Sequence, residues 1–138
     1  MTRVIGIGSP FGADQLGWLA IDHLQTCQLT ACELIKLDRP GSGLLDYFRG
    51  VDHVVLIDAL VSSGRVGEVK LIGLDELEDC SGLTSCHGFG VAEALGLADK
   101  LDLLPTRVSL IGIQIQEDLS YLPSLDTSAL ERQVQGLI

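Results

Sequence analysis

The sequence predicts an α/β domain, a three-layer α/β/α sandwich around a mostly parallel, twisted sheet of roughly five strands. β-rich runs alternate with stretches of helical periodicity along the whole chain, the order expected when helices connect parallel strands. The run from His53 to Ile57 is apolar almost throughout, which is typical of a central strand covered on both faces. The 138 residues contain no repeat, linker or low-complexity stretch, so we expect a single domain over residues 1–138.

The first half of the chain begins with a strand and a helix. Residues 3–8 are β-rich and end in a turn cluster at residues 9–12. Apolar side chains over residues 16–24 then recur at the spacing of one helix face, and Asp14 lies at the start of this helix, where a carboxylate is favoured. The elements that follow are a strand over residues 33–37, a glycine-containing loop, a short helix through Tyr47 and Phe48, and a strand over residues 53–57 that runs into Asp58.

The second half of the chain alternates in the same way. Residues 68–74 form a predicted strand, and residues 90–103 have the apolar spacing of a helix. Residues 107–115 are again β-rich. The chain ends in an amphipathic helix predicted over residues 125–137, which completes the alternation that the α/β sandwich requires.

The charge balance excludes two classes of partner. The chain carries 9 Lys and Arg against 19 Asp and Glu, a formal net charge of −10, so nucleic acid and anionic membranes would be repelled. No apolar run approaches the roughly 18 residues that span a bilayer, and the first residues lack the pattern of a signal peptide. We expect a cytoplasmic monomer with no nucleic-acid or membrane partner. Hydrophobic residues make up 46% of the chain and aromatic residues only 4%, which predicts an aliphatic core.

The cysteines are expected to be free thiols. None of them forms a Cys-x-x-Cys pair, and a chain of this size needs no disulfide to hold its core together. This expectation covers Cys27, Cys32, Cys80 and Cys86.

Three potential metal ligands occur where strands end or helices begin. Asp14 follows the first strand, Asp58 follows the third, and His87 precedes a predicted helix. Functional crevices of α/β sheets lie past the carboxyl ends of the strands, so we expect these side chains on one rim, as an open site for a divalent transition ion. Singly, Asp14 and His87 are also ordinary helix-start residues, whereas a carboxylate after an apolar strand needs a partner. His23 and His53 are interpreted as structural or exposed.

The glycine loop suggests a second class of function, nucleotide binding. Residues 6–8 read Gly-Ile-Gly after a strand, as in the dinucleotide motif G-x-G-x-x-G, and Asp38 follows the second strand, where an acid would bind a ribose. The third glycine of the motif would fall at Phe11, however, and no phosphate loop ending in Gly-Lys-Ser or Gly-Lys-Thr is present. Asp14 would also repel a pyrophosphate, so this is the weaker hypothesis.

In these positions the chain resembles the hydrogenase maturation proteases, endopeptidases that trim the large subunit of nickel–iron hydrogenases. The family has G-x-G-N-P and then D-D-G-x-G, and residues 6–17 here read Gly-Ile-Gly-Ser-Pro-Phe-Gly-Ala-Asp-Gln-Leu-Gly. With one residue fewer in the turn, Asp14 matches the metal-contacting acid. Asp58, at a strand end before an alanine, matches the second carboxylate, and His87 the histidine before the next helix. The strand over residues 108–113 and the Asp38 loop with Gly41 and Gly43 are also similar.

The chain departs from the family pattern in the glycine loop. Ser9 replaces the usual Asn, Ala13 replaces the first acid, and Gln15 and Leu16 stand where Gly-x is usual. An alignment without a gap would put Gln15 on the metal-contacting position. We prefer the gapped alignment because it keeps both a carboxylate and the last glycine, Gly17, in place.

The resemblance implies an endopeptidase that removes a short C-terminal extension from a hydrogenase large-subunit precursor once nickel has been inserted. Asp14, Asp58 and His87 would contact that nickel, which arrives with the substrate and is not retained by the free enzyme. Two ways of breaking the peptide bond stay open: Asp14 or Asp58 acts as general base on water, or the metal polarises the carbonyl or acidifies a water. The alternatives are an inactive relative that only binds the precursor, and the nucleotide-binding domain.

Overall fold

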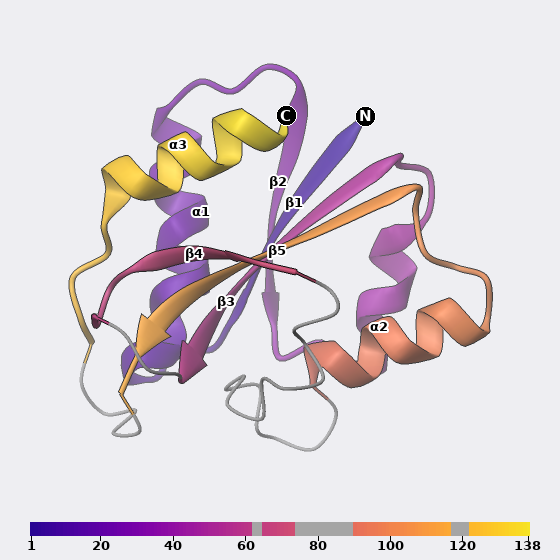
Figure 1. The fold of residues 1–138 in the computed structure, drawn as a ribbon, viewed down its shortest axis with the longest axis horizontal. Coiled ribbons are helices and arrows are strands. Elements are labelled where there is room, and N and C mark those ends of the chain that lie inside the picture. The colour runs from indigo at the N-terminus through magenta and orange to yellow at the C-terminus, as the bar shows by residue number, and fades with distance from the viewer. Residues whose placement is uncertain (62–64, 74–89, 117–121) are drawn as a thin grey trace.

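A computed structural model describes residues 1–61, 65–73, 90–116 and 122–138, and their strands form one five-stranded sheet (Figure 1). The order across the sheet is β2-β1-β3-β5-β4. β1 pairs in parallel with β2 and β3, β3 pairs in parallel with β5, and β4 at the edge runs antiparallel to β5. The strands are β1 (Thr2–Gly8), β2 (Cys32–Asp38), β3 (His53–Val61), β4 (Val69–Ile72) and β5 (Arg107–Ile115).

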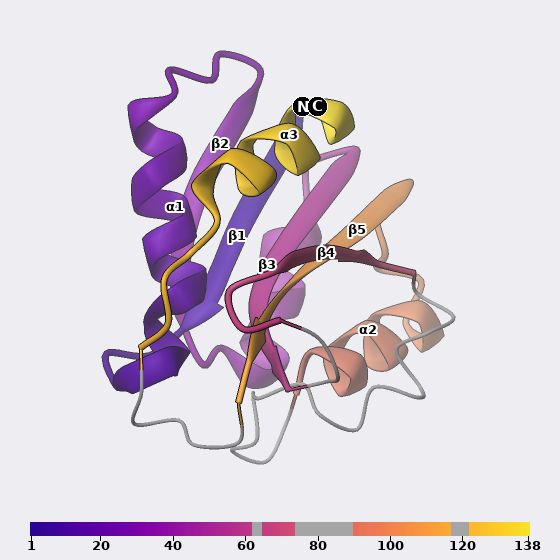
Figure 2. The ribbon, with the colours of Figure 1, turned by 60° about the vertical axis from the view of Figure 1, so that its left-hand side comes forward.

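Helices cover both faces of this sheet (Figures 1 and 2). Helix α1 (Leu16–Thr26) and helix α3 (Thr127–Leu137) lie on one face. The 3-10 helix η2 (Gly41–Phe48) and helix α2 (Val91–Lys100) lie on the other. The predicted three-layer α/β/α sandwich with a mostly parallel sheet is therefore confirmed. None of the helices within the described ranges is long and apolar enough to cross a membrane.

Successive side chains of the central strands point to opposite faces of the sheet, so these strands contribute to two hydrophobic cores. In β3, Val55 and Ile57 pack toward α1 and α3, whereas Val54 and Leu56 pack toward η2 and α2. All four side chains are fully buried. Burial of one aliphatic side chain of this size contributes about 1.5–3 kcal/mol. The run of apolar residues that predicted a central strand is continuous because helices cover both faces of β3.

The glycines of the first loop allow α1 to pack directly on β1. A Cβ at Gly6 would lie 2.2 Å from the Gly17 carbonyl oxygen, and a Cβ at Gly17 would lie 2.1 Å from the Ile7 carbonyl oxygen. No side chain fits either gap, because real Cβ atoms essentially never approach other atoms below 3.0 Å. The G-x-G pattern therefore serves close helix–strand packing.

Several element boundaries differ from the predicted ones. The prediction placed Asp58 just after the end of this strand. In the structure β3 continues to Val61, so Asp58 lies inside the strand. β3 continues because β5 pairs with it as far as Ile115 opposite Val61. β4 is shorter than predicted, the helix through Tyr47 and Phe48 is a 3-10 helix, and α3 starts two residues later, after the N-cap Asp126.

Candidate functional site

Asp14 is positioned by a turn after β1 that two backbone hydrogen bonds close. After β1 the chain passes Gly12, with φ +52°, and forms the short 3-10 helix η1 (Gly12–Gln15). The Asp14 N–H donates to the Phe11 carbonyl oxygen at 3.0 Å, and the Ser9 N–H donates to the Asp14 carbonyl oxygen at 3.1 Å. The Ser9 hydroxyl also donates to Asp14 Oδ2 at 2.5 Å. Both side chains are buried, so the carboxylate is held in one orientation.

Asp58 is the most deeply buried acid of the candidate site. Its side chain is 1% exposed, and its Oδ1 accepts a hydrogen bond from the Ala59 N–H at 2.8 Å. Its Oδ2 is buried and has no hydrogen-bond partner within the part of the chain that the structure describes. Burial raises the pKa of Asp58 well above its usual value, the Ala59 hydrogen bond lowers it, and the negative charge of Asp14 raises it further.

The fold brings these two acids together from different elements. β1 pairs with β3 only as far as Gly6 opposite Ile57, so Asp58 is the first residue of β3 beyond that pairing. The chain leaving β1 enters η1, which contacts β3 at this level. Asp14 is consequently buried near Asp58, whereas its neighbour Gln15 is partly exposed. Asp14, and not Gln15, is thus the buried residue of this turn that acts on Asp58, and its role as a metal ligand stays a prediction.

His87 lies outside the described residues, as do Cys80 and Cys86. Helix α2 begins just after Gly90, whose N–H donates to the Glu93 carboxylate at 3.0 Å. Along β3, Asp58 belongs to the same face as Leu56 and Leu60, two residues away on either side, which pack in the core beneath α2 and η2. Helix α2, which follows His87 in the chain, thus covers the face of the sheet to which Asp58 belongs. The third predicted ligand remains a prediction.

The glycine loop leaves little for a nucleotide phosphate to bind. A Cβ at Gly8 would lie 2.3 Å from the Asp14 carbonyl oxygen, so η1 already occupies the space over this glycine. The N–H and hydroxyl of Ser9 are both used by Asp14. Asp38 is exposed and forms an ion pair with Arg39 at 2.9 Å. A buried carboxylate in place of free donors is the opposite of a phosphate-binding loop.

Sequence reasoning missed the role of Ser9, which it treated only as a departure from the family's Asn. In the structure the Ser9 side chain is 1% exposed and fixes the Asp14 carboxylate. A single sequence carries no signal for this contact, because it depends on how the turn closes. His53 is structural, as interpreted: it is buried, it hydrogen-bonds with Ser109 Oγ at 2.8 Å, and burial together with Arg107 lowers its pKa.

Comparison with known proteins shows which family the chain is similar to. Residues 28–137 match the sequence model of the family HycI, described as hydrogenase maturation protease. The hydrogenase expression/formation protein HupD of Thiocapsa roseopersicina is 32% identical over 134 residues, which cover 94% of this chain and 61% of that protein. HupD of Bradyrhizobium diazoefficiens is 29% identical over 116 residues, 80% of this chain and 60% of that protein. The chain thus spans about three fifths of the length of these curated relatives.

Solved structures share the fold along nearly the whole chain. The hydrogenase maturating endopeptidase HybD from E. coli superimposes with a TM-score of 0.73 at 20% identity, over 99% of this chain and 88% of that one. The NiFe hydrogenase maturation protease HybD from Thermococcus kodakarensis gives a TM-score of 0.69 at 23% identity, over 99% of this chain and 95% of that one. At these identities the likeness establishes the fold.

Proposed function

The chain belongs to the hydrogenase maturation protease family, and from this premise we propose that it is an endopeptidase that removes the C-terminal extension of a nickel–iron hydrogenase large-subunit precursor after nickel insertion. The observation that carries the proposal is the pair of buried acids, Asp14 and Asp58, at the point where β1 stops pairing with β3. Buried acids are costly to a fold, and such groups concentrate at functional sites.

Nickel recognition would use Asp14, Asp58 and His87. Two carboxylates and one imidazole are hard or borderline ligands without a thiolate, a set that binds a divalent transition ion only moderately. That suits a metal that belongs to the substrate and must leave with it. Asp58 Oδ2 has no partner within the described ranges and is therefore the oxygen most in need of a cation or a proton. The Ser9 hydroxyl would keep Asp14 in the orientation that the metal requires.

Asp58 is also the better candidate for proton transfer. Burial and Asp14 raise the pKa of Asp58, and a general acid or base works best when its pKa lies near the working pH. In this role its carboxylate would take a proton from the attacking water and return it to the leaving amine. Polarisation of the scissile carbonyl by the substrate's nickel is the other route, and both place Asp58 beside the reacting bond.

The first test compares nickel-loaded with nickel-free precursor of the large subunit. We expect the purified protein to shorten only the nickel-loaded form, as measured by intact mass spectrometry. Asp58→Asn should slow this cleavage by at least about 100-fold. Asp99→Asn is the matched control, since it removes the same charge from an exposed position of α2, and it should cleave at the normal rate.

Two outcomes would contradict the proposal. Tight complex formation without cleavage would indicate the inactive binding relative that the loss of the first acid at Ala13 suggests. Normal cleavage by Asp58→Asn would mean that the site assignment is wrong.

A further inference from the structure

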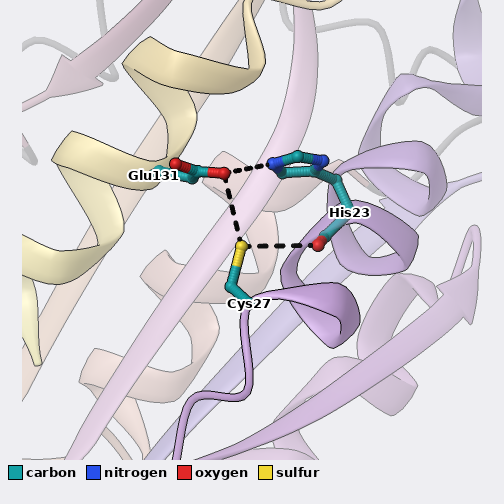
Figure 3. A group of neighbouring side chains, drawn as sticks. All are labelled: His23, Cys27 and Glu131. Atoms are coloured by element: carbon teal, nitrogen blue, oxygen red, sulfur yellow. Dashed lines mark hydrogen bonds and ion pairs between the residues drawn. The ribbon is translucent and has the colours of Figure 1, made fainter.

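A second group of potential metal ligands lies between α1 and α3, as Figure 3 shows. His23 Nε2 is 2.6 Å from Glu131 Oε1, and the Cys27 thiol donates to the same oxygen at 3.4 Å. The three ligand atoms lie within 4.8 Å of one another, and no other such group occurs in the ranges that the structure describes. The interpretation of His23 as a structural or exposed residue did not foresee this cluster, because Glu131 comes from the far end of the chain.

The cluster is built on two anchored helices. His23 and Cys27 are four residues apart at the end of α1, so their side chains lie on the same side of the helix. Glu131 is held opposite them because its neighbours on α3, Leu130 and Val134, are fully buried in the core. α1 is eleven residues long, roughly 16 Å, and Asp14 lies before its other end. The cluster is therefore separate from the Asp14–Asp58 site.

We propose that His23, Cys27 and Glu131 bind a divalent cation of borderline softness, Zn²⁺, which ties α3 to the end of α1. A nitrogen, a sulfur and a carboxylate oxygen are all zinc ligands, and the thiolate disfavours Mg²⁺ and Ca²⁺. Ligands of a tetrahedral zinc ion lie roughly 3.3–3.8 Å apart. The Sγ–Oε1 distance of 3.4 Å already fits. The His23–Glu131 distance of 2.6 Å must lengthen, which a rotation of the partly exposed carboxylate allows.

The local charges also suit a cation. Bound zinc would meet one thiolate and one carboxylate, so that the two negative charges balance the ion. The cluster lies at the C-terminal end of α1, where the last carbonyl groups of a helix favour positive charge. The His23 carbonyl oxygen there accepts from both Thr26 Oγ, at 2.6 Å, and the Cys27 thiol, at 3.5 Å. A water would complete the coordination, since His23 and Glu131 are 27% and 39% exposed.

The test uses Co²⁺ as a spectroscopic substitute for Zn²⁺ on the reduced, chelator-treated full chain. We expect one equivalent to produce a thiolate-to-cobalt charge-transfer absorption that Zn²⁺ abolishes. The absorption should be lost in Cys27→Ser and retained in Cys32→Ser, a partly buried thiol outside the cluster. His23→Gln and Glu131→Gln should each weaken Co²⁺ binding at least about tenfold. Zn²⁺ should raise the melting temperature of the unmodified protein and not that of Cys27→Ser.

The remaining thiols and the acid pair provide the controls. A Cys80→Ser/Cys86→Ser double variant should keep the absorption, and so should Asp58→Asn, so that failure here is distinguishable from failure of the proposed protease function. Circular dichroism establishes that each variant is folded, and His23→Gln tests the site should Cys27→Ser unfold. The proposal is overturned if the absorption is absent, if it survives in Cys27→Ser, or if it disappears only in the Cys80/Cys86 variant.

Discussion

At the scale of single residues, Asp58 shows a conflict between folding and chemistry. Its side chain is almost fully buried, and its Oδ2 has no partner within the described ranges. A nearby carboxylate, Asp14, makes the charged form still less favourable. Nothing in the packing of β3 needs an acid here, since its neighbours in the strand are all aliphatic. The residue therefore costs stability, and its presence supports a functional role.

This cost predicts how stability depends on pH. Because the pKa of Asp58 is raised in the folded state, the folded protein holds a proton that the unfolded chain releases. The free energy of unfolding should consequently fall as the pH rises from the unfolded pKa through the folded one. Asp58→Asn should remove that part of the fall and be more stable than the unmodified protein at alkaline pH, by at least about 1 kcal/mol, because it carries no charge to bury.

Urea denaturation from mildly acidic to alkaline pH, with chelator present, measures this effect. Asp38→Asn, which changes an exposed acid, should follow the unmodified protein at every pH. A destabilised Asp58→Asn would mean that the carboxylate has a stabilising partner.

At the scale of elements, the contact between α1 and β1 determines where the site forms. Glycines at positions 6 and 17 let the two backbones approach until a carbonyl oxygen fills the space of each missing Cβ. The same approach brings η1 over Gly8 and buries Asp14. A glycine motif that resembles a nucleotide loop in the sequence thus has a packing role, and the site depends on it.

Alanine substitutions of two helical glycines test this role. Gly17→Ala places a Cβ 2.1 Å from the Ile7 carbonyl oxygen and 3.0 Å from that of Ile57, both of which are backbone atoms with little freedom to move. We expect a loss of about 3 kcal/mol in the free energy of unfolding. Gly96→Ala, in α2, meets nothing within 4 Å and should gain about 0.5–1 kcal/mol from helix propensity. Chemical denaturation of both variants gives the comparison, and equal effects would refute it.

At the scale of the whole molecule, the excess of acids must be accommodated on the surface. The candidate site uses two of the 19 acids, and all the other acids in the described ranges are exposed or partly exposed. Such a surface opposes compaction by its own repulsion and keeps the protein in solution. It would also attract a basic segment of the proposed precursor substrate.

Screening of this repulsion should be visible in thermal unfolding. A net charge of −10 predicts that the melting temperature rises between roughly 0.01 and 0.15 M NaCl, as the Debye length falls from about 30 to about 8 Å. Scanning calorimetry at fixed pH measures the change, and KCl should act in the same way because the effect depends on ionic strength. A falling melting temperature would mean that attractive ion pairs, such as Arg3 with Glu33, outweigh the repulsion.

The sequence by itself determined the architecture and the order of the elements, and it predicted a site at the two acids that the structure buries near each other. Apolar periodicity suffices to predict the architecture and the element order, because burial of one helix face or of both faces of a strand leaves a repeating pattern along the chain. Only the tertiary structure decided that Asp58 lies within β3, that Ser9 fixes Asp14, and that Glu131 meets His23 and Cys27. These features depend on contacts between segments far apart in the chain or on the closure of one turn, and neither leaves a period in the sequence.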